Sequence, residues 1–453
     1  MKITNLVIVL VMLSCPVGCD QSELEPANPI SILTATIDGV GLNANENVSV
    51  NATIELIFSA ALDPVKFTSE LSLSSASTNV NFKITYANGG TKATLEPELE
   101  YGQSYALLIN TGTIGSAGER LFAPLEYSFT TAQDDVIRSM APCTSTSACL
   151  RSVQLQGSLG FGAFQFYSNY PIYEENAAWE NLTQAIIVVH GASHDPDNYF
   201  NYLTTTLNAA SLSESTVLIS PFFRETSTGS ENDFYWTGAT YRQGNQSSNN
   251  NKISSFQVID QLIDQLANSD RFPVLKKVII TGHSSGAAFT HVYAGANISE
   301  SVHTEIEFQY VVANSQFFYY PDGQRINEAD NQLYIPAGCP SYEIWPLGYT
   351  STPPYLSGVA EASFNSKFIS RSITYLLGNG NQSDPTLNTT NCENTVQGST
   401  RYKRGENMFR YMELVYATSH QHAKKIVNGI GHDGSGMYQS TEFRSLLIEL
   451  LQD

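Results

Sequence analysis

The feature that most restricts the fold of this chain is the Gly-x-Ser-x-Gly pattern at residues 282–286, which directly follows a β-branched apolar run at residues 278–280. The small and apolar residues after Gly286 favour a helix. A serine at the tip of a sharp strand-to-helix turn has strained backbone angles, and glycines two positions before and after it make that turn sterically possible. The pattern therefore predicts that Ser284 stands at such a turn, beside a helix N-terminus that favours negative charge.

Glycine and serine are also common in ordinary turns, so the pattern by itself is weak. The apolar strand before it and the helix-forming residues after it supply the context of a nucleophilic serine. At neutral pH a serine hydroxyl needs a general base, and the base needs an acid that orients it. In an open parallel sheet, both partners are expected on loops at the carboxyl ends of strands.

Among the eight histidines, His432 is the best candidate for the general base. It lies in the glycine-rich segment 429–436, just before the last helical pattern, where flexible backbone lets an imidazole reach over the serine. Asp384 is the candidate acid, because it follows the last apolar strand pattern before His432. The alternative role for Asp384 is that of a turn residue before Pro385.

The loop after the apolar run at residues 185–189 is predicted to help stabilise a developing oxyanion. The candidate donors are the backbone amides of Ala192 and Ser285, with the amide of Ser193 as the alternative to the first. Aromatic side chains near strand ends or in the long loop 221–252 are candidates for substrate contacts, or else members of the core. These substrate-contact candidates are Tyr199, Trp236 and Phe317.

The periodicity of apolar residues divides the chain of 453 residues into two predicted domains. Residues 29–132 contain short alternating runs separated by Gly, Asn, Asp and Pro, which is typical of a β-sandwich. Residues 133–453 begin with a transition segment at 133–180 and continue as apolar strands that alternate with helical patterns. That alternation predicts an α/β fold with a mostly parallel sheet and helices on both faces.

Residues 1–28 are predicted to be an export signal followed by a polar tether, because Lys2 precedes an apolar run at residues 6–13 and then small residues. The run is too short to span a bilayer as a mature helix. The residues before Cys19 resemble a bacterial lipobox, and Cys15 is a second candidate for lipidation. The alternative is a plain secretory signal, so the mature chain is expected to be an envelope lipoprotein or a secreted protein.

Four cysteines follow the predicted export signal, and an even number in an exported chain suggests two disulfides. Proximity favours a bond between Cys143 and Cys149, which leaves Cys339 to pair with Cys392. A metal site is the alternative. No two of these cysteines form a Cys-x-x-Cys pair and no histidine stands beside them at ligand spacing, so no metal is expected.

The charge of the chain bears on its partners. Acidic residues outnumber basic residues 43 to 23, and the formal net charge is −20. Such a charge repels the phosphates of nucleic acids, so no nucleic-acid partner is expected.

Both predicted domains resemble known families. Residues 29–132 resemble the bacterial Ig-like domains in these segments: 53–59, 94–97, 100–105 and 127–131. Residues 133–453 resemble the α/β-hydrolases, specifically a secreted serine esterase-like branch. The motifs that carry this second resemblance are His190-Gly191, 253–256, 271–273, 282–286, 312–315, 339–342 with Trp345, Gln397-Gly398 with Arg401, and 431–434. The first resemblance implies a spacer or an adhesive module.

The α/β-hydrolase resemblance implies hydrolysis of an ester through an acyl-enzyme, with the chain order serine, aspartate, histidine and no cofactor. Ser284, Asp384 and His432 would be nucleophile, acid and base. Family members often carry an aspartate soon after Leu-Leu-Gly, and Asn381 is near that position here. The expected substrates are small, medium or polymer-borne esters. The alternatives are a serine peptidase or amidase on the same scaffold, and a catalytically inert surface-binding lipoprotein.

Overall fold

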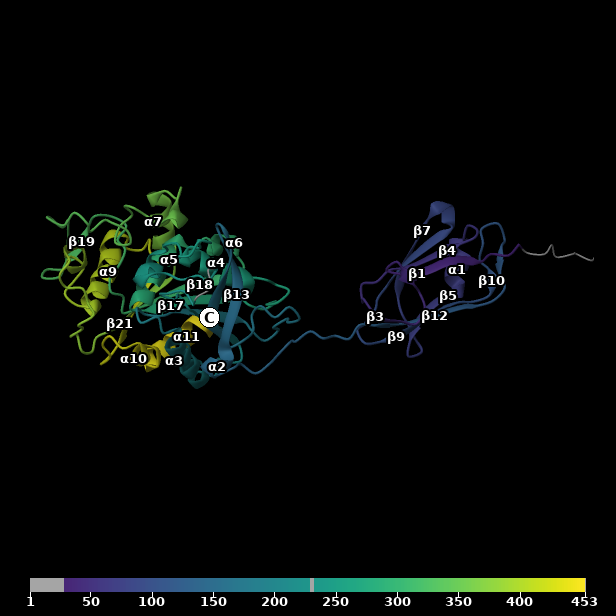
Figure 1. The fold of residues 1–453 in the computed structure, drawn as a ribbon, viewed down its shortest axis with the longest axis horizontal. Coiled ribbons are helices and arrows are strands. Elements are labelled where there is room, and N and C mark those ends of the chain that lie inside the picture. Colours follow the sequence, from purple (N-terminus) through teal and green to yellow (C-terminus); the bar gives the residue numbers. More distant parts are fainter. Residues whose placement is uncertain (1–27, 229–231, 453) are drawn as a thin grey trace, which may run out of the picture. The chain divides into compact units, whose positions relative to one another are not determined.

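The computed structural model describes residues 28–228 and 232–452. The chain divides into two compact units between Asp135 and Val136 (Figure 1). The predicted export signal and both candidate lipidation sites, Cys15 and Cys19, lie outside the described residues. Within the described residues, no helix combines the length and the apolar character that crossing a bilayer requires.

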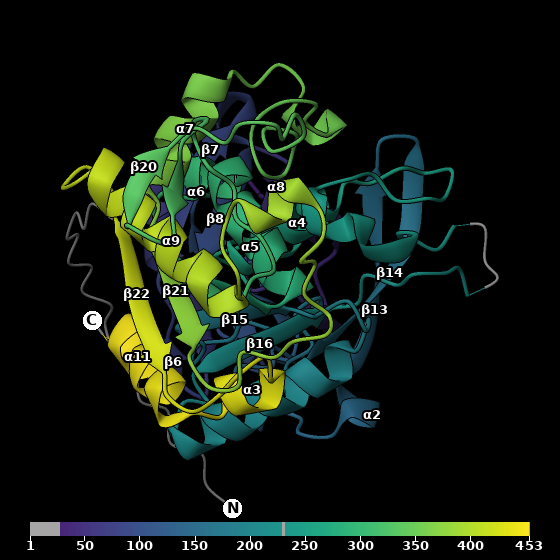
Figure 2. The same ribbon diagram turned by 90° about the vertical axis from the view of Figure 1, so that its left-hand side faces the viewer.

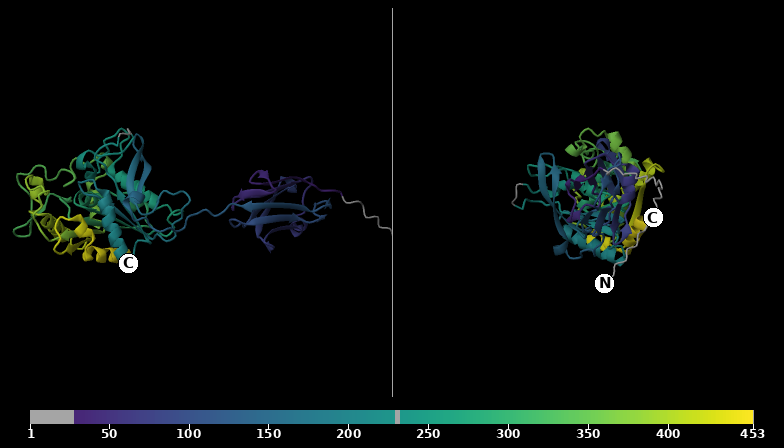
Figure 3. Two further views of the ribbon diagram at one scale, coloured as in Figure 1. Left: turned by 60° about the horizontal axis from the view of Figure 1, so that its bottom comes forward. Right: turned by 90° about the vertical axis from the view of Figure 1, so that its right-hand side faces the viewer.

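The first unit is a sandwich of two five-stranded sheets, seen from two sides in Figure 1 and Figure 3. Their strand orders are β2-β1-β4-β8-β7 and β3-β12-β9-β5-β6. Every second residue of β4 and of β9 is buried, and the buried residues of both sheets share one core, as expected for aligned sheets packed face to face. The strands are β1 (Ile32–Ile37), β2 (Val40–Gly41), β3 (Asn45–Val48), β4 (Ile54–Phe58), β5 (Leu71–Ser75), β6 (Thr78–Asn79), β7 (Phe82–Ala87), β8 (Lys92–Pro97), β9 (Ser104–Ile109), β10 (Gly112–Thr113), β11 (Arg120–Leu121) and β12 (Leu125–Thr131).

One short helix in this unit, α1 (Pro64–Glu70), has no counterpart in the apolar periodicity. Its start is encoded locally, because the Asp63 carboxylate accepts hydrogen bonds from the amides of Val65 and Lys66, and Pro64 takes the first helical position. A helix of only one or two turns needs no more than such a cap and one buried side chain, which is Phe67 in α1.

The second unit contains one eight-stranded sheet with the order β13-β14-β16-β15-β17-β18-β21-β22. The first three strands in this order pair antiparallel, and the remaining pairs are parallel. This order is that of the α/β-hydrolase fold, so the predicted fold class is confirmed. The strands are β13 (Leu150–Gly157), β14 (Gly160–Ser168), β15 (Gln184–Val189), β16 (Thr216–Pro221), β17 (Lys277–His283), β18 (Glu307–Ala313), β21 (Ile373–Gly378) and β22 (His422–Val427), with a separate hairpin of β19 (Arg325–Asn327) and β20 (Gln332–Tyr334).

Helices cover both faces of this sheet, and alternate residues of one strand enter different cores. Ile187 and Val189 of β15 pack in a core with residues of α4, α5, α7 and α9. Ile186 and Val188 pack in a second core with residues of α3, α10 and α11, on the other side of the sheet (Figure 2). The helices are α2 (Thr146–Cys149), α3 (Pro196–Ala209), α4 (Ser255–Leu266), α5 (Ser285–Ala296), α6 (Ser299–Val302), α7 (Glu361–Ser370), α8 (Cys392–Thr395), α9 (Arg401–Val415), α10 (Gly434–Tyr438) and α11 (Thr441–Gln452).

The prediction of a mere transition segment at residues 133–180 is wrong, because this segment contains the edge hairpin of β13 and β14. Burial alternates strictly along β14, with Phe164 and Phe166 among the buried residues. Phe164 and Phe166 therefore follow the period of two that is typical of a half-buried strand, whereas Phe161 and Tyr167 lie on its other face.

Both predicted disulfides are present. Cys143 is bonded to Cys149, with a Cα–Cα distance of 5.8 Å, and Cys339 is bonded to Cys392, with a Cα–Cα distance of 5.7 Å. The second bond joins chain segments 53 residues apart and holds the start of α8. As the sulfurs are bonded to each other, they offer no thiolate to a metal ion.

Candidate active site

The sharp turn predicted from the glycine pattern is present between β17 and α5. Ser284 has φ 59° and ψ −113°, a strained conformation for a residue with a side chain, and its amide donates to the carbonyl of Ala313 at 3.1 Å. A Cβ atom on Gly286 would lie 2.0 Å from the carbonyl oxygen of Val189, and one on Gly282 would lie 2.2 Å from the carbonyl of Gly286. The two glycines are thus required for the close approach of β17, α5 and β15 at the serine.

The candidate base and the candidate acid lie side by side on loops that follow neighbouring strands. Asp384 follows β21 and His432 follows β22, and Nδ1 of His432 is 3.2 Å from Oδ2 of Asp384. Asn314, at the end of β18, connects the starts of the two loops by accepting a hydrogen bond from the amide of Gly378 and donating one to the carbonyl of Gly431, both at 2.8 Å.

Two further side chains surround the carboxylate of Asp384. Arg401 donates to Oδ2 of Asp384, and Thr386 donates to Oδ1 through its hydroxyl at 2.6 Å and through its amide at 2.9 Å. Burial raises the pKa of Asp384, but the hydrogen bonds from Thr386 and Arg401 and the charge of Arg401 outweigh burial and hold this pKa well below its usual range. The carboxylate of Asp384 is therefore ionised at neutral pH.

The hydrogen bonds of His432 assign its protons. Nδ1 has two acceptors, Oδ2 of Asp384 and, at 3.3 Å, the hydroxyl of Thr386, so the proton of a neutral ring belongs on Nδ1. Nε2 is buried and has no hydrogen-bond partner among the described residues. Burial and the charge of Arg401 lower the pKa of His432, and Asp384 compensates only in part. A neutral imidazole with a free Nε2 lone pair is the form that a general base requires.

Ser284 and His432 line the same open cavity, which has a volume of about 440 Å³. No direct hydrogen bond joins them, since Nε2 of His432 has no partner in the described part of the chain. Such bonds are often long in the absence of substrate and tighten when it binds. The cavity is also lined by Ala192, Ser285 and Tyr199, and Asp384 contacts the cavity residue His432.

The ring of His283 is stacked on the ring of His432. The ring of His283 lies 5.0 Å from the ring of His432, with an angle of 24° between their planes. Nδ1 of His283 is in turn 3.0 Å from the hydroxyl of Tyr199. Burial lowers the pKa of His283 well below its usual value, so this ring packs against the candidate base without adding a positive charge.

The predicted oxyanion donors face the cavity from two elements. In the described part of the chain, neither the amide of Ala192 nor that of Ser285 has a hydrogen-bond acceptor, and both residues line the cavity. The loop of Ala192 is anchored by Tyr241, whose hydroxyl donates to the carbonyls of His190 at 3.0 Å and Gly191 at 2.8 Å. Two unpaired amides on a fixed loop and at a helix N-terminus are suited to bind a developing oxyanion.

The three predicted substrate-contact residues lie in different places. Tyr199 lines the cavity of Ser284, although its hydroxyl is occupied by His283. Phe317 lines an adjoining cavity. Trp236 lies away from both cavities and is fully buried, with its ring 5.1 Å from that of Phe223 and its Nε1 donating to the carbonyl of Asn245. A large aromatic ring with its one donor satisfied is stable in the core, and this explains the position of Trp236.

Three residues of the site were not assigned from the sequence, namely Thr386, Arg401 and Arg242. Arg401 belongs to a segment that carries the family resemblance, but nothing in its local pattern indicates a partner. It is the first residue of α9, and its contact with Asp384 depends on how α9 packs beside the loop after β21. Arg242 donates from Nη1 to the hydroxyl of Ser285 at 3.4 Å, a contact between segments 43 residues apart.

Replacing Arg401 by glutamine is expected to move the acid limb of the pH profile of kcat/KM to higher pH by about one unit. The wild-type limb should lie below pH 6.5, the usual value for histidine, because burial and Arg401 lower the pKa of His432. Without the guanidinium, protonated His432 is less disfavoured, so the base is lost at a higher pH. Arg410→Gln on the same helix removes an exposed arginine and should leave the limb in place. An unmoved limb in Arg401→Gln would contradict this role for Arg401.

Comparison with known protein families identifies the first unit by its sequence. Residues 40–131 match the family described as the bacterial Ig-like domain, which confirms the first predicted resemblance. No curated protein sequence matches the chain significantly. Among solved structures, the LpqC poly(3-hydroxybutyrate) depolymerase from Bordetella parapertussis has 17% identity and a TM-score of 0.47, with 66% of this chain and 90% of that one covered.

Two other solved structures have TM-scores equal to or lower than this one. The poly(aspartic acid) hydrolase-1 from Sphingomonas sp. KT-1 has 18% identity and a TM-score of 0.47, covering 67% of this chain and 98% of its own. An S-formylglutathione hydrolase from Agrobacterium tumefaciens has 10% identity and a TM-score of 0.39, covering 70% of this chain and 99% of its own. These values are too low to assign a function to the chain.

Proposed function

We propose that this chain, which carries a bacterial Ig-like domain and a domain of the α/β-hydrolase fold, is a serine-dependent hydrolase of carboxylic esters. One observation carries the proposal. A strained serine at a helix N-terminus shares a cavity with an imidazole whose Nδ1 is next to an ionised carboxylate and whose Nε2 is free. This combination of nucleophile, base and orienting acid performs acyl transfer on several unrelated folds.

In the proposed mechanism, Oγ of Ser284 attacks the ester carbonyl while Nε2 of His432 takes the hydroxyl proton. The amides of Ala192 and Ser285 bind the oxyanion of the tetrahedral intermediate. The C–O bond to the alcohol then breaks, the alcohol leaves with the proton from His432, and an acyl-enzyme remains. Water, deprotonated by His432, attacks the acyl carbonyl, and the breakdown of this second intermediate releases the acid and restores the Ser284 hydroxyl.

The role of Asp384 follows from its position. Its carboxylate holds the proton of His432 on Nδ1 and stabilises the imidazolium that forms when Nε2 takes the serine proton. The hydrogen bonds from Thr386 and Arg401 keep the carboxylate ionised and fix its orientation.

A fluorophosphonate probe, combined with a matched chromogenic ester and amide, tests the proposal. We expect covalent labelling of Ser284 in the folded wild type, and hydrolysis of the ester but not of the matched amide. Ser284→Ala should show no labelling and so controls for reaction at other serines. Hydrolysis of the amide at a rate similar to that of the ester would favour a peptidase or amidase. Absence of both labelling and turnover would favour an inert surface-binding protein.

The proposed setting of this activity is the bacterial envelope or the extracellular space. The two disulfides and the bacterial Ig-like domain support export. In this proposal residues 1–28 direct export, with lipidation at Cys19 or Cys15, residues 29–132 act as a spacer, and residues 133–453 carry the ester hydrolase. Mass spectrometry of the protein recovered from membranes distinguishes a lipidated N-terminus from simple secretion.

A further inference from the structure

A second cavity adjoins the one that holds Ser284. It has a volume of about 380 Å³ and shares the lining residue Gln316 with the first cavity. Arg242 lines it and donates to the hydroxyl of Ser285, the residue next to the proposed nucleophile. A substrate with its carbonyl at Ser284 therefore has room to extend into this second cavity, which we call the side pocket.

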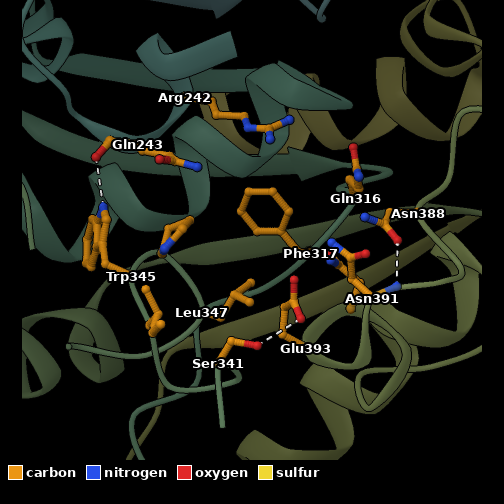
Figure 4. A pocket seen from close by; sticks show the side chains of 13 residues that line it. Arg242, Gln243, Gln316, Phe317, Ser341, Trp345, Leu347, Asn388, Asn391 and Glu393 are labelled. Atoms are coloured by element: carbon orange, nitrogen blue, oxygen red, sulfur yellow. Dashed lines mark hydrogen bonds between the residues drawn. The ribbon is translucent and has the colours of Figure 1, made fainter. Parts of the chain in front are cut away.

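The walls of the side pocket carry one cation, one apolar ring and several amides. Figure 4 shows Arg242 above the ring of Phe317, and the guanidinium carbon is 5.2 Å from the centre of that ring. Amide side chains surround these two groups, and they belong to Gln243, Gln316, Asn388, Asn391 and Asn394. The carboxylate of Glu393 lies at the opposite end of the pocket from Arg242 and accepts a hydrogen bond from Ser341 at 2.9 Å.

Arg242 is half-buried, and among the described residues it has neither an anionic partner nor the carbonyl acceptors that satisfy the fully buried Arg404, which donates to the carbonyls of Gly398, Gln316 and Asn388. Arg325, Arg371 and Arg401 each form an ion pair with a glutamate or an aspartate. No carboxylate of the described residues lies within ion-pair distance of Arg242. Its Nε is buried without a hydrogen-bond partner, and its contact with Ser285 is long. A partly buried cation without a counter-charge is unfavourable, so the side pocket is complementary to an anion.

The anion that fits best is a single carboxylate. A guanidinium presents parallel N–H donors that match the two oxygens of a carboxylate, and one cation balances one negative charge. Glu393 in the same pocket disfavours a dianion such as a phosphate monoester. The overall charge of −20 repels anions at long range, so recognition of a carboxylate must come from local groups such as Arg242.

We propose that the side pocket selects esters whose acyl or alcohol part carries a carboxylate. This part of the ester extends past Ser285 into the side pocket, where Arg242 binds the carboxylate. The inference rests on the proposed ester hydrolysis and names its substrate class. The carboxylate would complete the ion pair that Arg242 lacks, while the face of Phe317 would contact the carbon chain between the carboxylate and the ester.

A pair of esters of equal chain length tests this proposal on the acyl side. The pair is 4-nitrophenyl hydrogen glutarate, which carries a carboxylate, and 4-nitrophenyl valerate, which does not. We expect the wild type to show a higher kcat/KM for the glutarate, and Arg242→Gln to lower the ratio of the two kcat/KM values by about 10- to 100-fold. Both esters use the same oxyanion donor, Ser285, so any effect of the substitution on that donor cancels in the ratio of the two kcat/KM values.

Two control variants separate a local contact from a change in total charge. Arg410→Gln removes an exposed positive charge in the second half of α9. It should keep the wild-type ratio of the two kcat/KM values. Arg242→Lys keeps the charge but loses the paired donors, so its ratio should fall between those of the wild type and Arg242→Gln. If Arg242→Gln does not fold, as judged by circular dichroism, the lysine variant carries the test.

The alcohol side is tested with 3-carboxypropyl acetate and butyl acetate, which have the same number of carbons in the alcohol, in the same three variants, followed by titration of the released acid. A drop of the ratio in Arg242→Gln for either pair supports the proposal and identifies the part of the ester that enters the side pocket. Hydrolysis of all four esters with ratios that do not change on substitution of Arg242 would overturn it. Failure of all four esters together with no fluorophosphonate labelling would instead refute the proposed ester hydrolysis.

Discussion

Replacing Ser284 by alanine is expected to lower kcat for ester hydrolysis by about 10⁴- to 10⁶-fold. The hydroxyl is the atom that forms the acyl-enzyme, and no other hydroxyl stands at the β17–α5 turn in the same strained conformation. The amides of Ala192 and Ser285 remain in the variant, so a residual rate above that in water is expected from oxyanion stabilisation. The measurement is kcat on an activated ester at saturating concentration, with active-site titration of the wild type.

Ser193→Ala is the matched control, because Ser193 lines the same cavity and its backbone amide is unaffected by the substitution. It should keep kcat within about tenfold of the wild type. The double variant Ser284→Ala/His432→Ala should be no slower than Ser284→Ala alone, since the base has no function without the hydroxyl. More than a hundredth of the wild-type rate in pure, folded Ser284→Ala would contradict the role of this serine.

Replacing Asp384 by asparagine is expected to lower kcat by about 10⁴-fold. The amide nitrogen of asparagine can donate to Nδ1 of His432 and so favours the tautomer with its proton on Nε2, which cannot act as a base. The variant also lacks the negative charge that stabilises the imidazolium. Because the pKa of Asp384 lies well below its usual range, the wild-type carboxylate is ionised throughout and the loss should be similar from pH 6 to pH 9.

Asn381→Ala controls for the alternative position of the acid in the loop after β21. Asn381 accepts a hydrogen bond from the amide of Ser383 at 3.0 Å and forms no hydrogen bond with the ring of His432 among the described residues, so a small effect on kcat is expected. Asp384→Asn leaves Arg401 without its ion pair, and thermal unfolding must therefore be measured beside activity. A large loss in Asn381→Ala with a small loss in Asp384→Asn would assign the acid elsewhere.

Local sequence determined much of the scaffold. The β-branched run at residues 278–280 and the glycines at 282 and 286 predicted the strand, the turn and the helix around Ser284, because periodicity and backbone sterics act over a few residues. The two disulfides followed from the number and spacing of the cysteines. Where a pattern was mixed, as in the aromatic run of β14, the strand was missed although burial alternates along it.

The composition of the site was decided by the tertiary structure. Asp384 and His432 come together because β21 and β22 are adjacent and parallel, and Arg401 joins them because α9 begins beside the same loop. Likewise, the sequence does not show that Arg242 has no anionic partner among the described residues. Local patterns therefore specified which helices and strands form and where the turn at Ser284 lies. The partners of the site residues depend on contacts between segments tens of residues apart, and only the packing of the sheet and helices sets those contacts.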